Sequence, residues 1–330
     1  MKGIHLIAIV LYALAGFASA ETLVVLNKSE HTVSLIDPRS GNTLAKLPVG
    51  RGPHEVIVSP DGRTAYVSNF GPYGICPAGD TMCKTLGNTI TVIDLASRMV
   101  KATYDYGSNR GQHGSVISRD GKHLWVTSET PQSLLEIDAA TGKLVNQWLT
   151  KQERSHLVVV TPDEKKFYVT NTISGSVSVI DRATGAVKVI PIGKGAEAIT
   201  ISPNGREVWV GMPKDNKIAV ISTAKDEVVE TFDSGGKQPQ RICFTPGGNE
   251  VWVSHVAGDT LTVIDAKSRK VVANVSVGKR PQGIVFSPDG RRGFFALSRS
   301  NQVAVIDVRD RSVVQNFETG LDPDGIGFGR

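Results

Sequence analysis

The sequence predicts an all-β fold, because its apolar residues alternate or run in fours and lack the three-and-four spacing of helices. Turns of the Ser/Thr-Pro type recur along the chain, each followed by a strand-like segment, as in "VSPDGRTAYVSN" and "VTPDEKKFYVTN". A second, alternating segment that ends near Asp also recurs, as in "TITVID" at 89–94 and "SVSVID" at 176–181. Short β-branched runs separated by turn residues are typical of strands.

The spacing of the repeat predicts the number of units. Seven copies of the second segment are present, and the intervals between them are 57, 44, 43, 41, 43 and 42 residues. A period near 43 residues with four short strands is typical of propeller blades. We therefore expect a seven-bladed β-propeller of four-stranded antiparallel blades. The intervals are counted between Asp37, Asp94, Asp138, Asp181, Ser222, Asp265 and Asp307.

The order of strands predicts how the ring closes. Each blade is expected to contain strands a to d, from the channel outward. The chain starts with a strand b at 22–27, and its last strand, at 324–329, has the pattern of a strand a. We therefore expect the C-terminal strand to complete the N-terminal blade, which leaves no inner edge unpaired. In the second blade, strands a to d are predicted at 54–59, 64–68, 89–94 and 99–104.

The repeated motifs resemble those of a known family. "FYVTN" at 167–171 and its variants "AYVSN", "LWVTS" and "VWVSH", together with "SPDG" and "VIDxxTG", are similar to the YVTN-repeat β-propellers that bacteria and archaea export. The resemblance covers residues 22–330 and implies an exported propeller. It implies no single chemistry, since the family includes surface-layer proteins and proteins encoded beside quinone-dependent alcohol oxidation.

Residues 1–20 are interpreted as a signal peptide. A basic residue precedes an apolar run, and the small residues that end at Ala20 fit a signal-peptidase site before Glu21. Residues 21–330 are expected to form one propeller domain, periplasmic or secreted, and monomeric. No later segment has the roughly eighteen consecutive apolar residues of a spanning helix, so we expect no membrane span.

Charge and cysteine content narrow the function classes. The formal net charge is +5, and no run of five or more Lys or Arg occurs, so nucleic-acid binding is disfavoured. In an oxidising compartment, Cys76 and Cys83 are expected to form a disulfide, which leaves Cys243 alone. The disulfide would make a rigid flap of the one long insertion, 70–87, between strands b and c of the second blade.

One position of the repeat is polar in every blade. It lies five residues before the Ser or Thr of the turn between strands a and b, at the entrance of the inner strand. Inner strands start at one mouth of the channel, so these residues are expected to ring that mouth. They are His54, His113, His156, Glu197, Gln240, Gln282 and Asp324.

Basic residues are expected at the same mouth. Arg51, Arg110 and Arg154 lie in loops between strands d and a, and Arg241 follows one of the ring residues. His255 is expected there too, in a loop between strands b and c. A mouth lined by arginine attracts anions.

The histidines leave several functions open. His54, His113 and His156, with Glu197, could bind a transition metal or haem, because imidazole is a ligand for zinc, copper and haem iron. They could instead act as general bases, or only cap strand ends and bind channel water. The leading prediction is a binding protein for a small anionic molecule, a metal or cofactor, or a periplasmic partner protein. The alternative is an enzyme that uses the same cluster, either a metal- or haem-dependent oxidoreductase or a lactonase or lyase.

Overall fold

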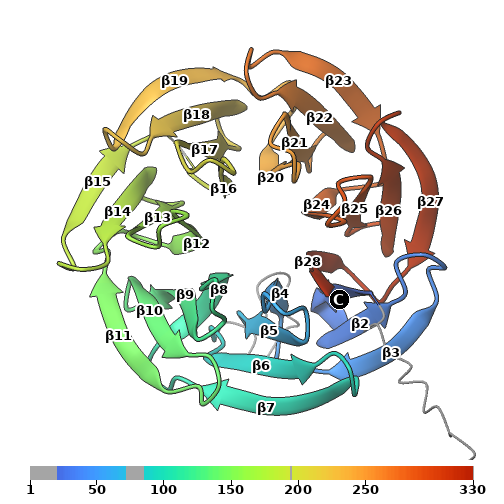
Figure 1. Cartoon of the computed structure of the whole chain (residues 1–330), viewed down its shortest axis with the longest axis horizontal. Helices are drawn as coiled ribbons and strands as arrows, with labels where there is room; N and C mark the ends of the chain where they lie inside the picture. The colour runs from blue at the N-terminus through green and yellow to red at the C-terminus, as the bar shows by residue number, and fades with distance from the viewer. Residues whose placement is uncertain (1–20, 72–84, 194, 330) are drawn as a thin grey trace, which may run out of the picture.

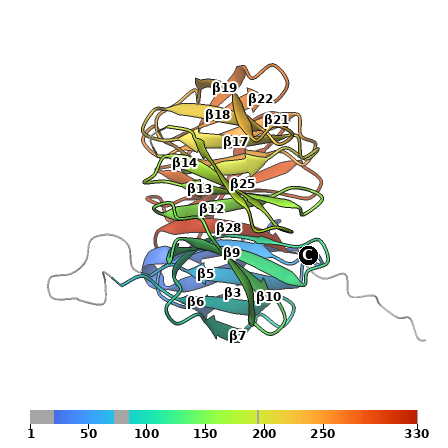
Figure 2. The ribbon, with the colours of Figure 1, turned by 90° about the vertical axis from the view of Figure 1, so that its left-hand side faces the viewer.

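The computed structural model describes residues 21–71, 85–193 and 195–329. Seven four-stranded antiparallel sheets form a closed ring around a central axis (Figure 1), which confirms the predicted seven-bladed propeller; we call the middle of the ring the channel. Seen edge-on, the ring is a thick disc (Figure 2). Within these ranges the only helical element is a 3-10 turn, η1 (Lys28–Glu30). The described residues therefore contain no helix that is long and apolar enough to cross a membrane.

The blades are numbered along the chain, and each is given from its inner strand a to its outer strand d. Blade 1 contains β28 (Pro323–Gly329), β1 (Thr22–Asn27), β2 (Thr32–Ile36) and β3 (Thr43–Pro48). Blade 2 contains β4 (Pro53–Val58), β5 (Thr64–Asn69), β6 (Thr89–Asp94) and β7 (Met99–Asp105). Blade 3 contains β8 (Arg110–Ile117), β9 (His123–Thr130), β10 (Ser133–Asp138) and β11 (Leu144–Leu149). Blade 4 contains β12 (Ser155–Val160), β13 (Lys166–Asn171), β14 (Ser176–Asp181) and β15 (Val187–Pro191).

The remaining three blades follow the same order. Blade 5 contains β16 (Ile199–Ile201), β17 (Glu207–Met212), β18 (Lys217–Ser222) and β19 (Glu227–Asp233). Blade 6 contains β20 (Pro239–Phe244), β21 (Glu250–His255), β22 (Thr260–Asp265) and β23 (Val271–Ser276). Blade 7 contains β24 (Pro281–Phe286), β25 (Arg292–Leu297), β26 (Gln302–Asp307) and β27 (Ser312–Glu318).

Blade 1 closes the ring as the strand order predicts. β28 pairs antiparallel with β1, and Leu23 lies opposite Phe328 and Val25 opposite Ile326. The last strand of the chain thus supplies strand a of the first blade (Figure 1). This pairing removes the free inner edge that β1 would otherwise present.

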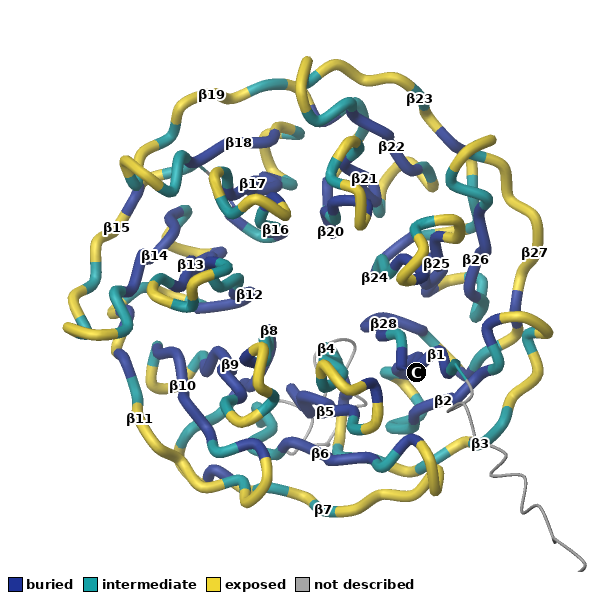
Figure 3. The backbone as a smooth tube through the Cα atoms, viewed as in Figure 1, coloured by how far each residue is buried: buried dark blue, intermediate teal, exposed yellow. Residues whose placement is uncertain are grey.

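Burial falls from the middle of each blade to the rim (Figure 3). Strands b and c are almost wholly buried, whereas the outer strands, such as β7, are largely exposed. The core lies between neighbouring sheets, where fully buried aromatic side chains pack across the junctions. Trp252 of blade 6, for example, packs against Phe295 of blade 7 with ring centroids 5.5 Å apart. The aromatic positions of strand b therefore hold the blades together.

A β-bulge marks the entrance of the inner strand. In blade 2, Pro53 pairs with Asn69 and Glu55 with Ser68, so the register shifts at His54. The same shift occurs at the starts of β8, β12, β20, β24 and β28. A bulge re-aims the side chain of the residue that it leaves unpaired. In these six blades the polar residue of the repeat is thereby released from the ladder, whereas Glu197 of blade 5 lies just before β16.

Candidate functional site

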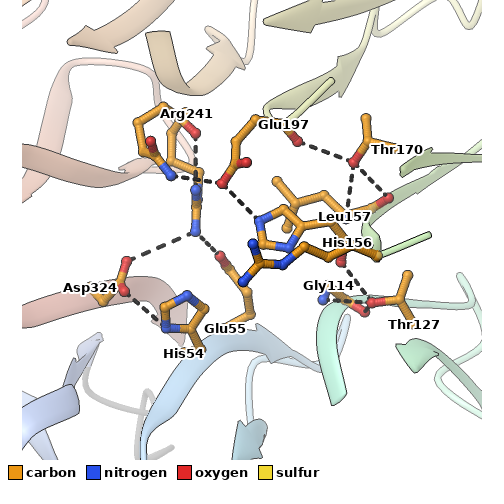
Figure 4. Close-up of polar contacts among 12 residues, drawn as sticks. His54, Glu55, Gly114, Thr127, His156, Leu157, Thr170, Glu197, Arg241 and Asp324 are labelled. Atoms are coloured by element: carbon orange, nitrogen blue, oxygen red, sulfur yellow. Dashed lines mark hydrogen bonds and ion pairs between the residues drawn. The ribbon is translucent and has the colours of Figure 1, made fainter. Parts of the chain in front are cut away.

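Residues of the predicted ring meet at one end of the channel. The ring centroids of His54 and His113 are 4.2 Å apart, and those of His113 and His156 are 3.7 Å apart. The three histidines come from three different blades. These short distances therefore mean that their side chains converge instead of each capping its own strand. Polar residues of other inner strands join them (Figure 4). We call this group the axial cluster: His54, Glu55, His113, His156, Glu197, Gln240, Arg241 and Asp324.

Glu197 joins blades 4, 5 and 6 within the axial cluster. Its Oε1 atom accepts hydrogen bonds from His156 Nε2, at 2.9 Å, and from Gln240 Nε2, at 2.8 Å. Burial alone would raise the pKa of Glu197, but the charge and hydrogen bond of His156 and the charge of Arg241 outweigh it and lower the pKa to about 2. Glu197 is therefore an ionised acceptor at neutral pH.

Arg241 joins blades on opposite sides of the channel. Its Nη2 atom donates to Glu55 Oε1 of β4, and its Nη1 atom donates to the carbonyl oxygen of Gln240 at 2.9 Å. Nη2 also lies 3.9 Å from Asp324 Oδ1 of β28. Burial alone would lower the pKa of the Arg241 guanidinium, but the carboxylates of Glu55 and Asp324 outweigh burial and raise this pKa. One arginine thus compensates two carboxylates.

Asp324 links the histidines to this network. Its Oδ2 atom lies 3.0 Å from His54 Nδ1 and accepts a hydrogen bond from Lys28 Nζ at 3.1 Å. Burial would raise the pKa of Asp324, but the nearby charges of Lys28 and Arg241 hold it well below its usual range. Asp324 is therefore a second ionised carboxylate of the cluster.

Two of the imidazoles are held neutral. Burial lowers the pKa of His54 to about 3, although Asp324 opposes the shift. Burial, with the neighbouring His156 and His54, also lowers the pKa of His113 well below its usual value. The His113 residue is 1% exposed, and neither ring nitrogen has a hydrogen-bond partner among the described residues. His113 is the least compensated polar group of the axial cluster.

The arrangement does not support the expected metal site of His54, His113, His156 and Glu197. Within the part of the chain that the structure describes, no group of three or more His, Cys, Asp or Glu is placed to hold a metal ion. The imidazoles pack directly against one another, and a metal ion would need a gap with nitrogens about 2 Å away. A haem or metal at these residues would require the rings to separate.

The cluster is reached through its carboxylates. The side chains of Glu55 and Glu197 are 18% and 19% exposed, compared with 7% for His156. Burial raises the pKa of Glu55 despite the opposing charge of Arg241. A molecule that enters the mouth therefore meets Glu55, Glu197 and His54, whose side chain is 17% exposed, before it meets His156.

A cleft of about 230 Å³ opens beside the axial cluster, between Arg51 and Arg110. Arg110 Nη1 donates to the carbonyl oxygen of Leu86 at 3.2 Å, which fixes this arginine at the edge. Among the described residues its lining contains both arginines and no acidic residue, and we call it the arginine cleft. It is completed by Asn69, Gly71, Thr85, Leu86, Gly87, Asn88 and Thr89.

Phe70 connects the arginine cleft with the axial cluster. Its ring lies 5.4 Å from the His54 ring and 5.1 Å from the His113 ring. The next residue, Gly71, lines the cleft, and its N–H donates to the carbonyl oxygen of Arg51 at 3.0 Å. Phe70 thus contacts the imidazoles directly, and its chain neighbours Asn69 and Gly71 line the cleft.

Other predicted mouth residues have different surroundings. Arg154 Nε donates to Glu129 Oε1 at 3.0 Å, so its charge is compensated and the mouth is less positive than the loop sequences predicted. Gln282 is buried at the second position of β24, and it makes no hydrogen bond to the axial cluster in the described ranges. These two residues lie at the mouth without extending the cluster.

His255 differs from the prediction. It is the last residue of β21, fully buried, and not in a loop that lines the mouth. The loop residue Gly236 packs closely on the His255 ring, since a Cβ atom added to Gly236 would lie 2.6 Å from that ring. Gly50 packs on Asn69 in the same way, with a distance of 2.4 Å for an added Cβ atom. His255 therefore occupies the asparagine position of the "YVTN" motif and packs against the preceding loop.

The predicted disulfide stays a prediction. Cys76 and Cys83 lie outside the described residues, as does most of the insertion that they were expected to stiffen. Cys243 is free, and burial raises the pKa of its thiol to about 12. Its side chain is partly buried and packs against the hydrophobic cluster between blades 6 and 7.

Sequence reasoning missed Glu55, Glu129 and Phe70. Glu55 and Arg241 occupy the same position of the repeat, directly after the ring residues His54 and Gln240. A comparison of this position across the blades would have shown an acidic and a basic residue that could pair. Glu129 and Phe70 end or follow strands b, where no periodic signal marks them. Only the spatial arrangement places them beside Arg154 and the histidines.

Comparison with known proteins bears on the fold. Residues 158–292 match the YNCE-like beta-propeller family model. This match agrees with the resemblance to YVTN-repeat propellers, and the seven blades confirm it for the fold. No curated protein sequence matches the chain.

Solved propellers resemble this chain over most of its length. Hydrazine synthase of Kuenenia stuttgartiensis is 19% identical, with a TM-score of 0.70 over 83% of this chain and 88% of that one. The dihydro-heme d1 dehydrogenase NirN is 17% identical, with a TM-score of 0.65 over 96% and 77%. The periplasmic gluconolactonase of Pseudomonas aeruginosa is 21% identical, with a TM-score of 0.73 over 94% and 99%. At these identities the likeness shows the fold alone, and that fold serves enzymes of different chemistry.

Proposed function

We propose that this chain is an exported binding protein that holds a small anionic molecule at the mouth of its channel. The observation that carries the proposal is the arginine cleft, in which Arg51 and Arg110 line one opening and Gly71 follows Phe70, the residue that contacts the axial histidines. Arginine presents a planar fork of donors that matches a carboxylate or phosphate. Arg51 and Arg110 would therefore hold the anionic group.

The axial cluster would bind the remainder of the molecule. Its exposed acceptors are the carboxyl groups of Glu55 and Glu197, which can accept hydrogen bonds from hydroxyl groups. His54 and His113 are neutral, so they add a donor or an acceptor without adding charge. A small hydroxylated acid, such as a sugar acid, combines the groups that these two parts of the site require.

Calorimetric titration with a panel of sugar acids and phosphate esters tests this proposal. The wild-type protein should bind at least one member saturably, and Arg110→Gln should weaken that binding about tenfold or more through loss of a charge-assisted contact. Lys122→Gln is a matched control, because Lys122 is exposed on the opposite face of the ring. The proposal fails if no member binds at millimolar concentration, or if the two variants bind like the wild type.

The contact between His156 and Glu197 favours a second candidate, hydrolysis of a lactone. An imidazole held by a carboxylate is a common arrangement of a general base. However, His156 Nδ1 is buried and unpaired, so a substrate would have to displace neighbouring side chains to reach it. Binding is therefore the better supported function. Hydrolysis of gluconolactone that is lost in His156→Ala would favour the enzyme instead.

A further inference from the structure

The junction between blades 7 and 1 lacks a contact that recurs elsewhere in the ring. Each contact joins the turns between strands a and b of two neighbouring blades. At four other junctions, the glycine of one such turn packs against the proline of the corresponding turn in the preceding blade. In blade 1, β28 and β1 are the last and first strands of the described chain, and no described turn joins them. Pro288 of blade 7 therefore has no turn glycine over it among the described residues. The four contacts are Gly121 on Pro60, Gly205 on Pro162, Gly248 on Pro203 and Gly290 on Pro246.

The same junction also lacks an ion pair. In blades 4, 5 and 6, the first residue of strand b forms an ion pair with a residue of the next blade. That partner lies in the turn between strands c and d of the next blade, four positions after the Asp or Ser that starts the turn. These pairs are Lys166 with Asp226 at 2.7 Å, Glu207 with Arg269 at 2.6 Å, and Glu250 with Arg311 at 2.5 Å.

Arg292 is the corresponding residue of blade 7, and Gly41 stands at the partner position of blade 1. Arg292 Nη1 donates to the carbonyl oxygen of Pro38 at 3.1 Å. No carboxylate of the described ranges lies within ion-pair distance of Arg292. The closing junction thus has a cation, Arg292, whose counterparts in blades 4, 5 and 6 each form an ion pair with the next blade.

A cleft of about 390 Å³ lies at this place, on the face opposite the mouth. Its volume is within the range of about 300–1,000 Å³ that is usual for small-molecule sites. Phe294 and Phe328, whose ring centroids are 5.8 Å apart, line it together with Pro288 and Arg292. We call it the closing cleft.

The charges around the closing cleft leave Arg292 in excess. Arg39 Nη2 lies 3.4 Å from Glu21 Oε2, and Arg291 Nε lies 3.9 Å from Asp289 Oδ2. Each acid of the lining is therefore matched by an exposed arginine. Arg292 is the one cation of the lining without an acidic partner in the described chain.

We infer that the closing cleft is a second binding site, which takes a small organic carboxylate. The carboxylate binds Arg292 in place of the partner that the next blade supplies to blades 4, 5 and 6, and the apolar body of the ligand packs on Phe294 and Phe328. This site is independent of the proposed function at the mouth, because it lies on the other face and shares no residue with the axial cluster or the arginine cleft.

Titration with benzoate, followed by two-dimensional NMR, tests this inference. The wild type should bind benzoate saturably, and the uncharged isostere benzamide should bind at least about tenfold more weakly. Arg292→Gln should weaken benzoate binding by a similar factor. Lys166→Gln is the matched control, since Lys166 occupies the equivalent position but is already paired with Asp226, and it should bind benzoate like the wild type.

Several results would overturn the inference: equal binding of benzoate and benzamide, unchanged binding in Arg292→Gln, or equal loss in Lys166→Gln. If Arg292→Gln does not fold, nuclear Overhauser contacts between benzoate and the Phe328 ring of the wild type decide the question. Their absence at saturation would place benzoate elsewhere. Because Arg110→Gln affects only the arginine cleft, it should leave benzoate binding intact.

Discussion

Arg241 and Glu55 contact each other across the channel, although 186 residues separate them in the sequence. Arg241 comes from β20 and Glu55 from β4, and Asp324 of β28 lies beside the same guanidinium. Three inner strands are therefore tied together at the axis by one buried side chain. The contact therefore links blades 6, 1 and 2 through their inner strands.

Replacing Arg241 should destabilise the ring. Arg241→Met leaves the carboxyl groups of Glu55 and Asp324 buried without their cation, and removing one partner of a buried pair costs about 3–5 kcal/mol. Urea unfolding followed by fluorescence measures the loss. The double variant Arg241→Met, Glu55→Gln should cost less than the sum of the single changes, since it removes one unpaired charge. A loss below about 0.5 kcal/mol in Arg241→Met, as for an ordinary surface residue, would contradict the account.

Adding a methyl group to Gly283 should push two inner strands apart. A Cβ atom there would lie 2.3 Å from the carbonyl oxygen of Asp324, which is backbone and cannot move aside freely. Gly283→Ala should therefore cost about 1–3 kcal/mol of unfolding free energy. Gly247→Ala, whose nearest neighbour atom would be 3.9 Å away, is the control and should change stability by less than about 0.5 kcal/mol. Equal effects of the two changes would contradict close packing of the inner strands.

Stability should fall with acid because His54 is held neutral. Its pKa is about 3 in the folded protein and 6.5 in the unfolded chain, so the unfolded chain binds the proton first. This contribution is complete above pH 6.5 and is lost as the pH falls toward 3, by at most about 1.4 kcal/mol per pH unit. Urea unfolding between pH 7 and pH 5 should show a shallower slope in His54→Gln. An unchanged slope would mean that His54 is not desolvated.

Removing β28 should open the ring. A chain that ends at Asp322 leaves β1 without its inner partner and exposes an unpaired strand edge. We expect lower stability to urea and self-association in size-exclusion chromatography. A truncated protein that stays monomeric and unfolds at the wild-type urea concentration would contradict the closure.

The fold could be predicted because a propeller repeats one local pattern. Turn residues, alternating strands and a constant period occur seven times, so irregular copies such as "ISRDGKHLWVTS" of blade 3 are corrected by the others. The closure of the ring could be predicted from the order of the strands. The sequence pattern starts with a strand b and ends with a strand a, so the pairing of β28 with β1 completes the seventh four-stranded blade. Both features depend on local sequence and strand order alone.

The candidate site could be predicted only in part. The repeat placed His54, His113 and His156 at one mouth, and the bulges explain how they leave their ladders. It could not give the partner of Arg241 or the packing of the rings, because these depend on the distances between blades across the channel. For the same reason the sequence overestimated the positive charge of the mouth, where Glu129 compensates Arg154.

The imidazole NMR signals of His113 test the central claim most directly. If the axial cluster and the arginine cleft form one site, a sugar acid or phosphate ester that binds the wild type should shift the His113 ring signals. The same shift should be absent from Arg110→Gln at equal ligand concentration. Saturable binding that leaves His113 unshifted, or a shift that persists in Arg110→Gln, would contradict a binding site shared by the arginines and the histidines.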